Sequence, residues 1–144
     1  MLINQSIRAF ALLGLLVASL CMLGQDSSFC LYEYAGSNTI WSTQDFPSGI
    51  SDDAEMFGIN AVIGLLFFIP LSLSYHRAWY IFFFVFFNLV QIIFLSSTIL
   101  SPSVFGLVYD SIVYCQNYGL LAWVVGELLF IVLSLVFIVH EFKN

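Results

Sequence analysis

The sequence predicts an all-α membrane protein with four transmembrane helices, cytoplasmic N- and C-termini, and a long acidic outer loop between the first and second helices. Hydrophobic residues make up 61% of the 144-residue chain and charged residues only 8%. Soluble domains are roughly 45–50% apolar and about 25% charged, so this chain lacks the charge to cover a surface in water. Four apolar runs each approach or exceed the length of about 20 residues that a helix needs to cross a bilayer. The few basic residues also fall on one side of the membrane if each run crosses once.

The four apolar runs predict helices, because four β-strands could not close a barrel in lipid. The runs lie at 7–24, 57–75, 79–100 and 118–140, with outer loops at 25–56 and 101–117. Without a repeat or a dividing linker, we expect residues 1–144 to form a single four-helix transmembrane domain.

The first apolar run has a second interpretation. A basic residue, Arg8, followed by an apolar stretch is also typical of a secretory signal. The best small-x-small cleavage pair is Met22 and Gly24, which fits that signal poorly. We therefore favour a retained helix.

Basic residues set the predicted orientation. Arg8 precedes the first helix, Arg77 lies between the second and third, and Lys143 follows the fourth. The positive-inside rule makes this shared side cytoplasmic. We expect an integral protein of the plasma membrane, most simply the bacterial inner membrane.

Carboxylates gather on the opposite side, where we expect an outer acidic surface. Its members are Asp26, Glu33, Asp45, Asp52, Asp53, Glu55 and Asp110. These groups either solubilise the outer loops or attract a cationic partner. A formal net charge of −6 argues against nucleic acid as that partner.

The outer loops have structure-forming patterns of their own. The β-branched and aromatic residues of 29–36 and 38–46 predict a short hairpin. Apolar residues at 104, 107, 108, 112 and 115 are close to helical spacing. A short interfacial helix and a simple packed loop both fit the second outer loop.

Three cysteines, Cys21, Cys30 and Cys115, all fall in the outer half. An oxidising compartment would permit a disulfide between Cys30 and Cys115. Two unpaired thiols packed as small apolar groups fit the sequence equally. No C-x-x-C pair is present, so thiol oxidation chemistry is not expected.

A glutamate in the fourth run is the main candidate for an intramembrane polar contact. Glu127 falls near the middle of that run, where a charge is costly, so it should face protein or water. Asn88, Gln91 and Thr98 share one stripe of the third run. We expect Asn88 or Gln91 to hydrogen-bond Glu127, since a neutral glutamic acid both donates and accepts.

Small and aromatic residues predict how the helices pack. Small residues that let helix backbones approach one another occur at Gly14, Ala18, Gly119, Ala122 and Gly126. They serve contacts either within the chain or with a partner. Five phenylalanines surround the third helix at 82, 83, 84, 86 and 87. They face either lipid or another membrane protein.

The sequence favours a non-enzymatic multi-pass membrane interaction protein. It would be an accessory subunit of a larger membrane complex or an immunity-type protein that neutralises a pore-forming toxin in the membrane. The alternative is a small oligomeric proton or cation channel or transporter that uses Glu127. No nucleophile–base pair, metal cluster or nucleotide loop is visible, so we expect no enzyme, no metal and no cofactor. The expected partners are the lipid bilayer, another integral membrane protein or an inserted toxin, and further copies of the chain.

Overall fold

Four long helices dominate the computed structural model, which describes residues 2–23, 29–32, 40–42, 50–74, 76–96 and 104–143. They are α1 (Leu2–Met22), α2 (Ile50–Leu73), α3 (Arg77–Leu95) and α5 (Tyr118–Lys143). Each contains a segment of 19 to 23 residues that is long and apolar enough to cross a membrane. This is the architecture of an integral membrane protein.

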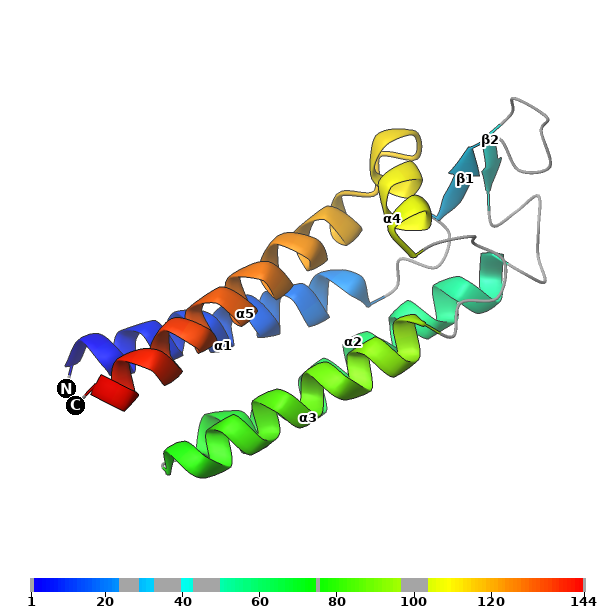
Figure 1. The fold of residues 1–144 in the computed structure, drawn as a ribbon. Coiled ribbons are helices and arrows are strands. Elements are labelled where there is room, and N and C mark those ends of the chain that lie inside the picture. Colours follow the sequence, from blue (N-terminus) through cyan, green and yellow to red (C-terminus); the bar gives the residue numbers. More distant parts are fainter. Residues whose placement is uncertain are drawn as a thin grey trace.

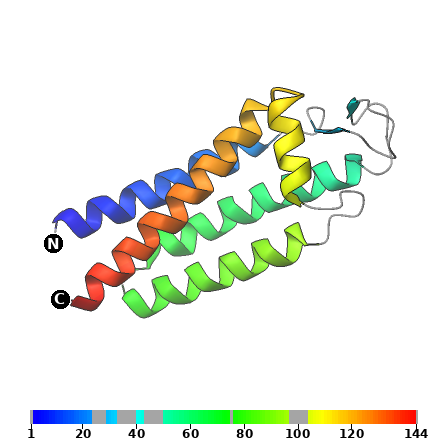
Figure 2. The same ribbon diagram turned by 45° about the horizontal axis from the view of Figure 1, so that its top comes forward.

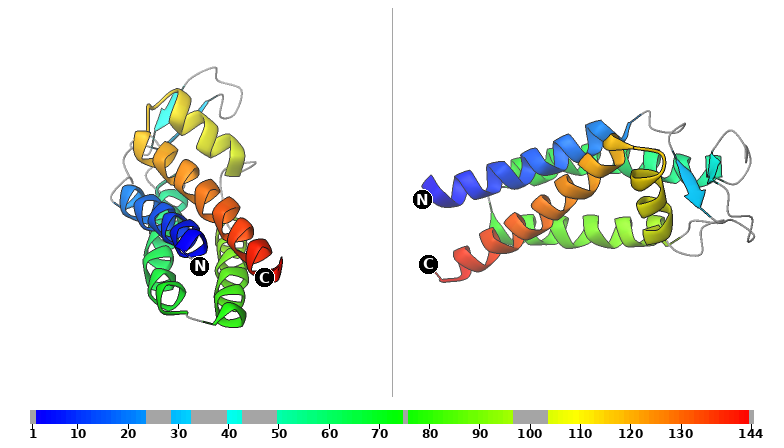
Figure 3. Two further views of the ribbon diagram at one scale, coloured as in Figure 1. Left: turned by 90° about the vertical axis from the view of Figure 1, so that its left-hand side faces the viewer. Right: turned by 90° about the horizontal axis from the view of Figure 1, so that it is seen from above.

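The long helices form a bundle in which successive helices alternate in direction. Both ends of the chain lie at one end of the bundle, here called the terminal end (Figure 1). The opposite end, the loop end, carries β1, β2 and α4 (Figure 2). Seen along its axis, the bundle has α1, α2, α3 and α5 at four corners (Figure 3). The α1–α5 pair has the most extensive contact, followed by α1–α2 and α2–α3.

The helix bounds differ from the predicted spans at both ends of the bundle. At the terminal end α1 begins at Leu2 rather than at 7, so Arg8 lies inside this helix and does not precede it, and α5 continues to Lys143. α2 begins at Ile50, seven residues before the apolar run that starts at 57. The added turns hold Asp52, Asp53 and Glu55, and acidic residues are favourable near a helix N-terminus. α3 ends at Leu95, short of the predicted position 100, and a Ser96 hydroxyl that donates to its own helix closes the last turn.

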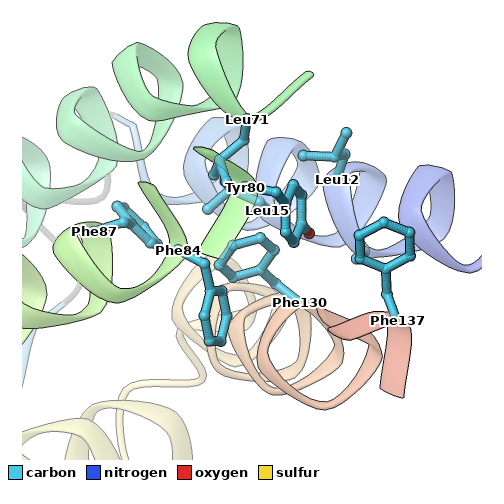
Figure 4. Packing of buried hydrophobic residues seen from close by; sticks show 9 residues of the cluster. Leu12, Leu15, Leu71, Tyr80, Phe84, Phe87, Phe130 and Phe137 are labelled. Carbon is cyan, nitrogen blue, oxygen red and sulfur yellow. The ribbon is translucent and has the colours of Figure 1, made fainter. Parts of the chain in front are cut away.

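Two apolar clusters fill the bundle, one toward each end. The loop-end cluster consists of Ala18, Met22, Phe29, Phe57, Ala61, Leu107, Leu120 and Trp123. The terminal-end cluster consists of Ala11, Leu12, Leu15, Leu71, Tyr80, Phe84, Phe87, Phe130 and Phe137. Figure 4 shows Phe130 of α5 pointing toward Phe84 and Phe87 of α3, with ring centroids 5.5 and 5.6 Å apart. Since lipid is as apolar as these side chains, close packing rather than removal from water stabilises them.

The α1–α5 crossing is built on the predicted small residues. A Cβ on Gly126 would lie 2.7 Å from the carbonyl oxygen of Gly14 and 2.7 Å from the Cβ of Ala18. Glycine is therefore needed there for the backbones to approach. The structure uses these three residues within the chain, whereas Gly119 and Ala122 are only half-buried.

Arg8 ties three helices together at the terminal end. Its Nη2 donates to the carbonyl oxygens of Leu71 at 2.8 Å and Ser72 at 2.7 Å, which lie at the end of α2. Carbonyls in the last turn of a helix have no partner within the helix, so this guanidinium satisfies two of them. The guanidinium carbon also lies 5.4 Å from the ring centroid of Tyr80 on α3.

Short elements cover the loop end. Strand β1 (Cys30–Tyr32) pairs antiparallel with β2 (Ile40–Ser42), with Leu31 opposite Trp41. Both strands fall within the stretches from which the hairpin was predicted. Helix α4 (Val104–Val113) runs across the bundle rather than along it (Figure 1). Of the two alternatives for the second outer loop, the structure therefore has the short helix.

Candidate functional site

Three buried polar residues from three different helices are joined by hydrogen bonds, and we call them the polar chain. Asn60 of α2 donates through Nδ2 to Oε1 of Gln91 on α3, at 3.2 Å. Gln91 in turn donates through Nε2 to Oε1 of Glu127 on α5, at 3.0 Å. Their exposed fractions are 1%, 8% and 8%, so all three side chains face protein rather than lipid.

The polar chain forms one layer between the two apolar clusters. On α5, Trp123 of the loop-end cluster and Phe130 of the terminal-end cluster lie one turn to either side of Glu127. On α2, Phe57 lies one turn before Asn60, on the loop-end side. Glu127 is nine residues into α5, or about 14 Å along the helix. Apolar side chains therefore separate this layer from both ends of the bundle.

The layer provides the partner that a carboxyl group needs inside a membrane. A charged residue at the centre of a membrane helix costs about 2.5–3.5 kcal/mol on insertion scales, and more in simulations. Hydrogen bonds between membrane helices return about 0.6–2 kcal/mol each. The Gln91–Glu127 bond also fixes the rotation of α3 relative to α5, because both side chains must point into the same layer.

The structure brings together two of the four residues predicted for this contact. Glu127 and Gln91 are bonded, but Asn88 is half-buried and donates instead to the carbonyl oxygen of Phe84 on its own helix, at 2.8 Å. Of the two alternatives for the Glu127 hydrogen bond, the structure therefore has Gln91. Thr98 lies outside the described residues.

Sequence reasoning missed Asn60, the third member of the polar chain. The available signal was an amide inside the apolar run 57–75, on the same stretch as the small residues Ala61 and Gly64. One oxygen of this residue stands out: Asn60 Oδ1 is buried and has no hydrogen-bond partner among the described residues.

A second polar contact joins α3 to α5 nearer the terminal end. The hydroxyl groups of Tyr80 and Ser134 share a hydrogen bond of 2.8 Å, and the two residues are 1% and 0% exposed. Tyr80 is the same residue that lies beside the Arg8 guanidinium. The pair was not predicted, because a tyrosine at the start of an apolar run is usually assigned to the membrane interface.

The loop end is fixed covalently and by hydrogen bonds. A disulfide joins Cys30 to Cys115, with Cα atoms 6.2 Å apart, and Cys21 is free. Ser111 of α4 accepts a hydrogen bond from the Cys30 amide at 3.1 Å and donates to the Cys30 carbonyl oxygen at 3.2 Å. Asn117 caps α5, since its Oδ1 accepts from the Leu120 amide at 2.8 Å.

The described residues contain only part of the predicted acidic surface. Glu55 is exposed on α2 and Asp110 is half-buried on α4, both at the loop end. Asp52 and Asp53 lie in the first turn of α2, and nothing further is described of their side chains. The remaining three, Asp26, Glu33 and Asp45, lie outside the described residues.

The described hollows open on the outside of the bundle. One of about 300 Å³ lies over the α1–α5 crossing, and one of about 490 Å³ lies between the ends of α2 and α3 near Trp79. Within the described ranges, no three His, Cys, Asp or Glu side chains are grouped to hold a metal ion.

Comparison of the chain with protein-family models, with curated proteins and with solved structures found no match.

Proposed function

We propose that this is a non-enzymatic multi-pass protein that acts by binding another integral membrane component. It would serve as an accessory subunit of a larger membrane complex, or as an immunity-type protein that neutralises a pore-forming toxin in the membrane. Its termini would lie on the cytoplasmic side, as the positions of Arg8, Arg77 and Lys143 favour. One observation carries the proposal: among the described residues the polar chain is a single layer with an apolar cluster on either side, while an ordered aromatic surface faces outward.

The single polar layer among the described residues supports binding rather than conduction. An ion path needs polar side chains, carbonyls or water along the length of the bundle. Here the polar chain is a single layer, and the aromatic residues Phe57 and Trp123 on one side and Phe87 and Phe130 on the other pack around it. Edge-on contact of Phe57 with Trp123, at 5.3 Å between centroids, tightens the loop-end side.

The outward surface is the aromatic face of α3, defined as Trp79, Phe82, Phe83 and Phe86. Trp79, Phe82 and Phe86 are 57%, 54% and 47% exposed. The rings of Phe82 and Phe86 stack with an interplanar angle of 8°. The ring centroids of Phe82 and Phe83 are 5.4 Å apart. Rings held in order by one another lose little freedom on binding, which makes them good anchors for a partner helix. Lipid contact alone is the competing interpretation.

A photo-crosslinking amino acid at position 86 separates these interpretations in native membranes. We expect a crosslinked protein of defined mass, identified by mass spectrometry. The matched control is position 128 on α5, where Leu128 is 57% exposed on a different helix. Crosslinks to lipid alone at both positions would leave the aromatic face with no partner protein and would refute the proposal.

The double variant Phe82→Ala/Phe86→Ala tests the aromatic face by removing two of its rings. We expect it to abolish the crosslink measured from a second site, Trp79, and co-purification in mild detergent. Leu128→Ala with Val132→Ala removes a similar amount of exposed apolar surface from α5 and should leave both intact. The identity of the captured protein then distinguishes a complex from a toxin.

The second candidate function is a small oligomeric proton or cation channel or transporter that uses Glu127. The observation in its favour is Asn60 Oδ1, a buried acceptor of the same layer that has no hydrogen-bond partner in the described part of the chain. Ion flux into liposomes measures it directly, and Glu127→Gln keeps hydrogen bonding but cannot titrate. A wild-type flux whose pH dependence disappears in Glu127→Gln would favour conduction over the interaction function.

A further inference from the structure

We propose that Glu127 binds and releases one proton inside the bundle, and that Gln91 and Asn60 transmit this change to α2 by reversing their side-chain amides. The site therefore takes a proton as its ligand and links α5 to α2 through α3. This inference does not depend on the partner that the protein binds. It also requires no proton movement across the membrane.

The direction of the hydrogen bonds motivates the proposal. Asn60 donates to Gln91, and Gln91 donates to Glu127, so both amide N–H groups point toward the carboxyl group. This is the direction suited to an ionised carboxylate, which can only accept. The series ends at Asn60 Oδ1, an acceptor that is buried without a partner among the described residues.

Protonation would reverse the series without changing which residues touch. A hydronium ion gives up one proton to the Glu127 carboxylate: one of its O–H bonds breaks, an O–H bond forms on Glu127, and a water molecule is left. The resulting acid can donate to the Gln91 oxygen. Gln91 must then turn its amide by half a rotation, so that its N–H donates to the Asn60 oxygen. Asn60 turns in the same way, and its outer atom changes from an acceptor to a donor. The hydrogen bonds of the polar chain break and reform in the opposite direction, and no other covalent bond forms or breaks.

The outer atom of Asn60 is the side-chain amide atom that does not face Gln91, Oδ1 in this structure. Asn60 belongs to α2, which also packs against α1. Ser19 of α1 is 1% exposed, and its hydroxyl lies against Gly64, one turn along α2 from Asn60. The state of Glu127 would therefore reach α2, the helix that packs against α1, as a change of the outer Asn60 atom between acceptor and donor.

A proton fits this site better than a metal ion. The polar chain offers one carboxylate, and Gln91 N–H already occupies one of its oxygens. A metal cation would need several oxygen ligands and space, whereas a proton needs neither. The described ionisable groups on the helices that pack against α5 are Arg8, Cys21, Arg77, Tyr80, Tyr109 and Asp110. In the described part of the chain, Gln91 is nevertheless the hydrogen-bond partner of Glu127.

Infrared difference spectroscopy tests proton binding directly, because a protonated carboxylic acid has its own carbonyl band. The protein is reconstituted in lipid nanodiscs and titrated with pH. We expect a reversible acid band that is lost in Glu127→Gln and kept in Glu55→Gln, a control that removes an exposed carboxylate of α2. Failure to find a Glu127-dependent band at any pH where the protein stays folded would overturn the proposal.

The amide reversal has its own readout in the side-chain NH₂ resonances of Asn60 and Gln91, assigned by their loss in Asn60→Leu and Gln91→Leu. We expect both resonances to shift over the same pH interval as the acid band, and to be unaffected by pH in Glu127→Gln. An acid band that titrates while the amide resonances stay fixed would overturn transmission to α2. Loss of the band when choline is replaced by sodium at constant pH would show that a metal cation displaces the proton, and it would overturn the preference of the site for a proton over a metal ion.

Discussion

The α1–α5 crossing provides the sharpest prediction, because one methyl group added at its centre has nowhere to go. In Gly126→Ala the new Cβ would lie 2.7 Å from Ala18 Cβ and from the Gly14 carbonyl oxygen. Carbon atoms pack best at about 3.5–4.0 Å, so the two helices must separate by roughly 1 Å. Such overpacking costs about 1–3 kcal/mol.

Gly14→Ala is the graded comparison on the facing helix. Its new Cβ would lie 3.0 Å from the Gly126 carbonyl oxygen and 3.4 Å from the next nearest atoms. The smaller overlap predicts a smaller loss of stability than in Gly126→Ala. Ala78→Leu adds more bulk at an exposed site on α3 and should leave stability unchanged.

Unfolding by SDS in mixed micelles, followed by near-UV circular dichroism, measures these differences. A loss of about 1–3 kcal/mol corresponds to a change of roughly 5- to 150-fold in the unfolding equilibrium. If Gly126→Ala is as stable as the wild type, or less affected than Gly14→Ala, the close approach of α1 and α5 at this point is refuted.

Three other changes test the contacts that hold the bundle. Replacing Cys30 and Cys115 with serine should lower stability by about 4–5 kcal/mol on chain-entropy grounds, because the disulfide closes a loop of 85 residues; the reduced wild type should match this variant in the same SDS titration. Arg8→Met should cost about 1.5–3 kcal/mol, because the last carbonyls of α2 lose a charged donor; recovery of part of the loss in Arg8→Lys would support this reason, and an unchanged midpoint in Arg8→Met would contradict it. Gln91→Leu should lower the free energy of unfolding by about 1–3 kcal/mol, because it leaves Glu127 without its hydrogen-bond donor. Glu127→Gln keeps an acceptor for Gln91 and should lower it little. Equal losses in the two variants would argue against the polar chain.

Hydropathy was sufficient to predict the four spans, because a membrane helix must be apolar along its whole membrane-crossing length. It could not predict where α2 starts. The stretch from Ile50 to Met56 lies beyond the apolar run and holds three acidic residues, and only the favourable effect of acidic residues near a helix N-terminus supports helix there. The two hairpin strands follow from a local pattern of β-branched and aromatic residues that does not depend on the bundle. The sequence could therefore predict the hairpin, whose strands pair over three residues each.

The candidate site was predictable only as far as one helix face. Asn88 and Gln91 share a stripe on α3, but they differ by about 60° around the helix, so the same neighbour cannot engage both equally. Which of them meets Glu127 depends on the rotation of α3 against α5, a property of the assembled bundle. Arg8 shows the same limit: its charge indicated the side of the membrane, but its carbonyl partners become visible only once α1 is placed beside the end of α2.

The pairing of α1 with α5 has a consequence for biosynthesis. The ribosome makes α1 before the other spans and α5 after them, yet these two helices share the largest interface of the protein. In a nascent chain that has inserted only α1, α2 and α3, the surface of α1 around Gly14 and Ala18 therefore has no α5 to pack against. It contacts lipid or a chaperone until α5 is inserted. The interface between α1 and α5 can therefore form only after the last helix has been made.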